Sequence, residues 1–225
     1  MVVAGEGDSD AARKALETLC QAYWYPIYLY VRRKGHGPDD AQDLTQEFLA
    51  QLIAKDHVSL ADRSKGKFRT FLLAMLDYFL AGEGRRANRQ KRGGKFMVFS
   101  LDQLAPEERY RLEPADKDTP EKQFLRQWAL TVLQQAMNAL EQECEANGKA
   151  AIFRETSGLL AGERRAGAYV GISQRLGMAE GATRVAVHRL RKRFGEILRE
   201  QIANTVENSS EVDEELGCLM GALSH

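Results

Sequence analysis

Residues 169–191 read YVGISQRLGMAEGATRVAVHRLR and combine two helical patterns with a break between them. Ile172 and Leu176 give the first pattern an apolar face, and Gly177 at the break is the residue type that accepts positive φ freely. The second pattern predicts one buried stripe, which continues past the quoted stretch: Thr183, Val187, Leu190, Phe194 and Ile197. The stretch therefore predicts a helix-turn-helix.

The second helix of this pair lies in a basic patch, residues 184–193, called here the second basic patch. Its expected outward side chains are Arg184, His188, Arg189, Arg191 and Lys192. A helix with its back in a core and cations outward suits a DNA major groove, where Arg pairs with guanine and other cations contact phosphate. The alternative is a solvated basic helix on an ordinary helical bundle.

Apolar residues recur at helical spacing along most of the chain, which predicts an all-α protein. Expected helices run from Asp39 to near Lys55, from Phe68 to about Ala81, and from Pro120 after a Thr119 cap; further ones cover about 149–160, 169–176 and 181–206. The pattern collapses from Gly93 to Thr119. We therefore expect two helical domains, 11–92 and 120–206, a flexible linker at 93–119, and a tail at 207–225.

The composition and the distribution of charge along the chain restrict which classes of function are possible. The 225 residues have a formal net charge of zero, but the cations gather in the second basic patch and in a first basic patch, residues 85–95. No apolar run approaches the roughly 20 residues of a membrane span, and the start of the chain lacks a signal-peptide pattern. We expect a cytoplasmic protein. Cys20, Cys144 and Cys218 are expected to be buried or partly buried thiols, with no metal site and no cofactor.

Seven segments carry a resemblance to a known family. They are YWYP at 23–26, GH at 35–36, DAQDLTQEF at 40–48, FRTFL at 68–72, QKRGG at 90–94, LGMAEG at 176–181 and VAVHRLR at 185–191. From Ala15 to Val206 the chain resembles bacterial RNA polymerase sigma factors of the extracytoplasmic-function (ECF) type. The resemblance implies two helical modules, region two within 11–92 and region four within 120–206, and no enzymatic site.

The resemblance also implies partners. In such proteins the DLTQE helix binds core RNA polymerase, which assigns Asp43, Gln46 and Glu47 to polymerase binding, while Leu44, Phe48 and Leu52 are expected to turn inward. Promoter DNA is the second implied partner. An anti-sigma factor is a third partner that the resemblance allows but does not require. The second basic patch would then read the minus-thirty-five element.

Region two of this family reads the minus-ten element, where a base is taken out of the stack and held. The candidate contacts are Arg63, Lys65, Lys67 and Arg69 for phosphate, Tyr78 for stacking, and Arg85, Arg86 and Arg89 for upstream duplex. Many relatives have asparagine where Tyr78 stands. Gly82 and Gly84 depart from the family's solid helix, and we expect the helix to fray or end early there.

Two functions other than that of a sigma factor are the alternatives. A helix-turn-helix regulator that is not a sigma factor is the main alternative, and a hydrolase using Cys144 or Ser157 with His188 lacks a nucleophile elbow. In the tail, Val212, Leu216, Leu219 and Met220 allow a short amphipathic helix, against a frayed terminus. The acidic run 213–215 would approach a basic patch and compete with DNA.

Overall fold

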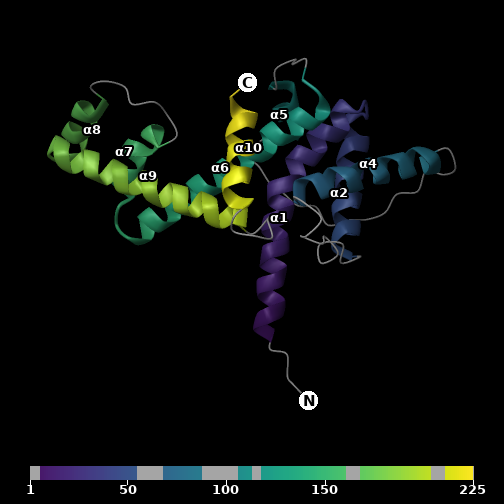
Figure 1. Cartoon of the computed structure of the whole chain (residues 1–225), viewed down its shortest axis with the longest axis horizontal. Helices are drawn as coiled ribbons and strands as arrows, with labels where there is room; N and C mark the ends of the chain where they lie inside the picture. Colours follow the sequence, from purple (N-terminus) through teal and green to yellow (C-terminus); the bar gives the residue numbers. More distant parts are fainter. Residues whose placement is uncertain are drawn as a thin grey trace. The chain divides into compact units, whose positions relative to one another are not determined.

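The structure is a computed structural model that describes residues 6–54, 68–87, 106–112, 118–160, 168–203 and 211–224. These residues are almost entirely helical and contain no strand, which confirms the all-α prediction (Figure 1). The chain divides into two units, Met1–Leu130 with Thr205–Glu207 and Gly217–His225, and Thr131–Asn204 with Asn208–Leu216. The division falls inside α6 (Pro120–Ala146), so the expected boundary at residue 120 stays a prediction.

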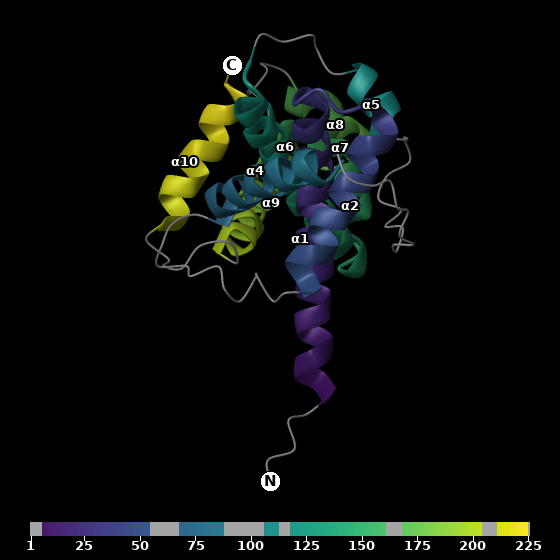
Figure 2. The ribbon, with the colours of Figure 1, turned by 90° about the vertical axis from the view of Figure 1, so that its right-hand side faces the viewer.

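The core of the first unit is the second half of α1 (Glu6–Arg33). Every residue from Ala22 to Val31 is buried, so this part of the helix is surrounded on all sides. Tyr23 packs edge-on against Phe68, with ring centroids 5.5 Å apart, and lies stacked near Phe124 at 6.3 Å. In Figures 1 and 2 the N-terminal half of α1 extends beyond α2 and α4.

Helix α2 (Pro38–Ala54) begins where the glycines predict it. Gly35 has φ of 97°, a conformation that glycine adopts at no steric cost, and the amide of Ala41 donates to the carbonyl of Gly37 at 2.9 Å. The buried face comprises Ala41, Thr45, Phe48, Leu49 and Leu52. Leu44, which we expected to turn inward, is only half-buried because it lies at the edge of this stripe.

Helix α4 (Phe68–Ala87) is longer than the sequence predicts. It runs through Gly82 and Gly84, so the expectation of an early end is wrong. A glycine costs an exposed helix about 1 kcal/mol relative to alanine, which weakens a helix without breaking it. Leu72 and Leu76 are fully buried one turn apart and anchor α4 in the unit.

Part of the interval predicted as a linker is a helix, α5 (Pro106–Leu112), that packs on α1. Glu107 accepts hydrogen bonds from Arg32 Nε and Nη2, both at 3.1 Å, and from the hydroxyl of Tyr28 at 2.8 Å. The Arg109 guanidinium lies 3.7 Å from the ring centre of Tyr25. Residues 106–112 therefore belong to the first unit, and the rest of the linker up to 117 lies outside the described residues.

Helix α6 starts as expected, with Thr119 Oγ1 accepting from the amide of Lys122 at 3.4 Å. Its buried positions recur every fourth residue: Phe124, Trp128, Val132, Ala136, Leu140 and Cys144. Leu133 and Met137, which we expected on this apolar face, are half-buried. The second unit continues with α7 (Ala150–Thr156), a 3₁₀ turn (Ser157–Leu159), α8 (Ala168–Leu176) and α9 (Glu180–Ala203).

The tail forms a helix, α10 (Glu211–Leu223), so the frayed terminus is wrong for these residues. Val212, Glu215 and Leu219 are buried, whereas Met220, expected in the apolar stripe, is 58% exposed. Asp213 pairs with Arg199 at 2.5 Å, and Arg199 lies beyond the second basic patch. Asp213 thus has a partner outside the second basic patch, and the expected approach of 213–215 to a basic patch stays a prediction.

Three further expectations concern cysteines, metals and membranes. Cys20 and Cys144 are buried, but Cys218 is exposed, which corrects its expected burial. Among the described residues no group of His, Cys, Asp and Glu side chains has an arrangement that would hold a metal ion. Within the same residues, none of the helices combines the length and apolarity that crossing a membrane requires.

Candidate nucleic-acid interface

The turn between α8 and α9 has the hydrogen bonds of a Schellman motif. Gly177 has φ of 61°, its amide donates to the carbonyl of Gln174 at 3.3 Å, and the amide of Met178 donates to the carbonyl of Ser173 at 3.0 Å. The chain leaves α8 in this left-handed step and enters α9 three residues later. The helix pair predicted from Gly177 is confirmed, and α8 packs on α9 (Figure 1).

Helix α9 has one buried stripe and one cationic face. The stripe holds the five residues that the spacing predicts: Thr183, Val187, Leu190, Phe194 and Ile197. Thr183 is fully buried, and its hydroxyl donates to the carbonyl of Ala179 at 3.3 Å, which satisfies the polar atom inside the core. Arg184, His188, Arg189 and Lys192 are all exposed, as expected.

The Arg184 guanidinium is held in place by two neighbours. Its Nη2 and Nε atoms donate to Glu180 Oε1 at 2.6 and 3.1 Å, and its Cζ atom lies 5.2 Å from the ring centre of Tyr169 on α8. An exposed ion pair of this kind is worth about 0–1 kcal/mol, so an anionic partner can displace Glu180. The i, i+4 spacing of Glu180 and Arg184 is a signal the sequence reading did not use.

Arg191 is not an outward residue. Its Nη2 and Nε atoms donate to the backbone carbonyl of Leu159 at 2.6 and 3.0 Å. The guanidinium joins the end of the 3₁₀ turn to α9, and the DNA contact expected at Arg191 stays a prediction. A hydrogen bond from a charged donor such as this stabilises a fold by about 1.5–3 kcal/mol.

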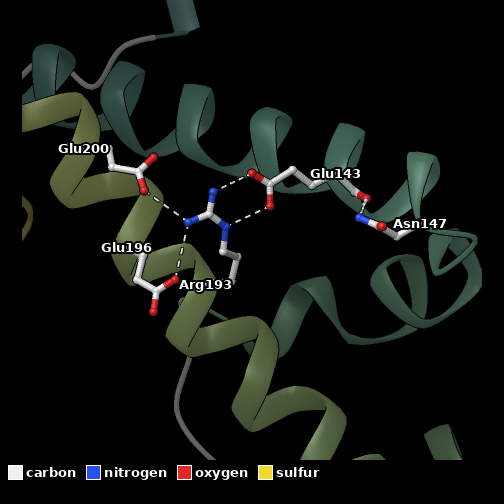
Figure 3. Close-up of polar contacts among 5 residues, drawn as sticks. All are labelled: Glu143, Asn147, Arg193, Glu196 and Glu200. Atoms are coloured by element: carbon white, nitrogen blue, oxygen red, sulfur yellow. Dashed lines mark hydrogen bonds and ion pairs between the residues drawn. The ribbon is translucent and has the colours of Figure 1, made fainter.

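Arg193, at the end of the second basic patch, is half-buried and surrounded by carboxylates (Figure 3). Its Nη2 and Nε atoms donate to the two oxygens of Glu143 on α6 at 2.6 and 2.8 Å, and Nη1 lies 3.1 Å from Glu200 and 3.4 Å from Glu196. Hydrogen bonds to Glu143 and Glu200 raise the pKa of Arg193, and those from Arg193 hold the pKa of Glu143 below its ordinary value. This cluster ties α9 to α6, with Asn147 donating to the Glu143 carbonyl at 2.7 Å.

The structure describes the side chains of only some of the residues expected to contact the minus-ten element. Arg63, Lys65, Lys67 and Arg89 lie outside the described residues, and Arg85 and Arg86 lie in the last turns of α4 where side chains are not described. Tyr78 on α4 is 73% exposed, so its ring is accessible. Arg69 is only 9% exposed, with its guanidinium 5.6 Å from the ring centre of Trp128. The phosphate contact expected there stays a prediction.

The DLTQE segment presents polar side chains on α2. Asp43 is exposed, and Gln46 and Glu47 are half-buried on the same side of the helix. Glu47 accepts a hydrogen bond from Gln51 at 3.1 Å one turn later. The buried face of α2 lies opposite, because Thr45, Phe48 and Leu52 pack inward. The three polar residues therefore form one accessible patch in the first unit.

No protein-family model, no curated protein and no solved structure matches the chain.

Proposed function

We propose that the chain is a sigma factor of the ECF type, which binds core RNA polymerase, directs it to promoters and catalyses no reaction itself. The observation that carries the proposal is α9, which buries one apolar stripe behind a tight glycine turn and exposes Arg184, His188, Arg189 and Lys192. This is the arrangement by which a recognition helix enters a major groove.

In the proposed complex the exposed arginines and the exposed lysine of α9 contact different parts of the DNA. Arg184 and Arg189 have the planar guanidinium that pairs bidentately with guanine, and each such contact discriminates by about 1–3 kcal/mol. Lys192, two turns from Arg184, would contact phosphate, as a point charge suits. On binding, Arg184 would exchange Glu180 for DNA, and Tyr169 would keep its guanidinium near the same position.

The polymerase contact is proposed for Asp43, Gln46 and Glu47. The accessible acidic patch on α2 supports it, because carboxylates held on a rigid helix can steer and orient a basic partner surface. For the minus-ten element, the exposed ring of Tyr78 supports base stacking. Arg63, Lys65, Lys67, Arg85, Arg86 and Arg89 stay predictions of this proposal.

The test is transcription by reconstituted holoenzyme. Full-length chain is mixed with purified core RNA polymerase of the host, and run-off transcription on fragmented host genome is followed by sequencing of transcript starts. We expect a shared promoter sequence upstream of the starts and none with core alone. A helix-turn-helix regulator that is not a sigma factor would bind DNA but would neither co-purify with core nor start transcription.

A charge-reversal pair tests the polymerase face. Asp43→Lys with Glu47→Lys is expected to abolish co-purification with core while leaving the helical circular dichroism unchanged, because both side chains lie on the accessible side of α2. The matched control is Glu141→Lys with Glu145→Lys on α6, which has the same four-residue spacing. Unchanged core binding by the Asp43 and Glu47 variant would overturn the polymerase assignment.

A further inference from the structure

Val185 is an apolar residue in the middle of the cationic face of α9, and it is 50% exposed. Successive residues of an α-helix are about 100° apart around the axis, so Val185 lies about 160° from Thr183 on one side and about 160° from Val187 on the other. Both of those residues are buried. The Val185 side chain therefore points almost directly away from the core.

The residue one turn before Val185 is Gly181, and the fold does not explain it. A Cβ atom at Gly181 would meet nothing within 4 Å, and its φ is not positive. Glycine in an exposed helix costs about 1 kcal/mol relative to alanine. The first two turns of α9 thus present bare backbone at Gly181 and a short apolar side chain at Val185, which follows Arg184 directly and lies one turn before Arg189.

The exposed backbone at Gly181 and the apolar side chain of Val185 are chemically complementary to one group on DNA, the methyl group of thymine. The N-terminal residues of a recognition helix face base edges, and the only apolar group on base edges in the major groove is the C5-methyl of thymine. Valine has no hydrogen-bonding atom with which to read any other edge. The missing side chain at Gly181 lets the helix backbone approach the groove closely enough for a side chain as short as valine to reach the bases.

We infer that Val185 is a specificity-determining residue that selects a thymine in the upstream promoter element by contact with its C5-methyl group, and that Gly181 permits the necessary approach. The inference rests on the proposed function for the identity of the DNA element. It adds apolar base readout to the guanidinium contacts, so the promoter should contain a thymine next to the position read by Arg184 or Arg189.

An exposed valine alone is ordinary on a protein surface. Val170 on α8 provides the comparison, because it is 46% exposed and lies outside the cationic face of α9. Val170→Ala is thus the matched control for Val185→Ala: the same atoms are lost, at similar exposure, without a change of charge.

The experiment begins with selection from a random duplex DNA pool by the full-length chain, alone and in complex with core RNA polymerase. Each thymine of the selected duplex is then replaced by deoxyuracil, which removes only the methyl group. We expect one replacement to weaken binding by wild type about fourfold, the value of one buried methyl. Val185→Ala should lose sensitivity to that replacement, and Val170→Ala should keep it.

Two results would overturn the inference. One is an equal loss on methyl removal for Val185→Ala and wild type; the other is a Val185→Ala variant that binds duplex normally and core polymerase poorly, which makes the valine a protein contact. Gly181→Ala gives a second reading, because we expect it to weaken duplex binding while thermal stability stays the same or rises. Unchanged duplex affinity in Gly181→Ala would show that the helix does not need a glycine at this position to approach the groove.

The outcomes also separate this inference from the proposed function. A methyl effect that depends on Val185, without core association or transcription, supports the inference and rejects the sigma factor. Transcription from a defined promoter with no such methyl effect rejects Val185 and keeps the sigma factor. If neither the chain nor its complex with core selects any duplex, both the inference and the reading role of α9 are wrong.

Discussion

Helices α1 and α9 are both long, 28 and 24 residues, yet they use their surfaces in opposite ways. From Ala22 to Val31 α1 is buried on every side, while α9 buries one stripe and leaves a cationic face exposed. The hydroxyl of Tyr30 on α1 donates to Asp77 inside the first unit at 2.9 Å, and burial is the main cause that raises its pKa to about 12.

The same contrast separates arginines from one another. Arg32 on α1 is held by both oxygens of Glu107, and Arg191 on α9 by the Leu159 carbonyl, whereas Arg189 is exposed. An arginine whose donors are aligned on buried or fixed acceptors stabilises the fold, and one on an exposed helical face is available to a partner. A basic patch in the sequence therefore contains more arginines than are exposed and available to bind a partner.

The largest expected effect tests α1 as the scaffold. Ile27→Ala, at a fully buried position, should lower the free energy of unfolding by about 2–5 kcal/mol, since it leaves a cavity in a close-packed core. Val170→Ala, on the exposed surface of α8, should change it by less than about 0.5 kcal/mol. Urea denaturation followed by circular dichroism measures both, and similar midpoints for the two variants would contradict the all-round burial of α1.

The next effect separates inward from outward arginines on α9. Arg191→Met should lower stability by about 1.5–3 kcal/mol, because the Leu159 carbonyl loses its charged donor. Arg189→Met should leave stability unchanged and lower discrimination at the guanine it reads by about 1–3 kcal/mol. Denaturation, and holoenzyme binding to promoter DNA with and without that guanine, measure the two effects, and the reverse pattern would exchange the roles of the two residues.

Acid should weaken the contact between α1 and α5. Burial alone would raise the pKa of Glu107, but hydrogen bonds from Arg32 and Tyr28 outweigh it and hold the pKa below its ordinary value. Because the folded pKa is the lower one, this stabilisation is complete above the unfolded pKa of about 4.3 and is lost as pH falls through the folded pKa. Thermal melts from pH 6 to pH 3 should show a smaller acid-induced loss in Glu107→Gln than in wild type.

The smallest effect concerns an exposed carboxylate on α9. Glu180→Gln should tighten promoter binding by up to about fivefold, because Arg184 no longer has to leave a carboxylate and phosphates no longer meet one. Added salt should reduce the gain, since the pair is exposed. Weaker binding by this variant would show instead that Glu180 positions Arg184 for its contact.

Local rules account for the parts of the fold that the sequence predicted. Gly35 and Gly177 mark turns because only glycine adopts positive φ at no cost, and the Thr119 cap locates the start of α6. The buried stripe of α9 follows from the helical period alone. These signals concern neighbours within a few residues, so they survive whatever packs around them.

The tertiary structure decided which charged residues face inward. Arg69 and Arg191 look like Arg189 in sequence, but the first lies against Trp128 and the second reaches a carbonyl 32 positions away. Helix α5 was missed for the same reason, since its seven residues are too few for a stable helix alone and are held by Arg32, Tyr28 and Tyr25 of α1. Periodicity gives the direction of a side chain around its own helix, but the partner it meets there depends on segments brought together by packing.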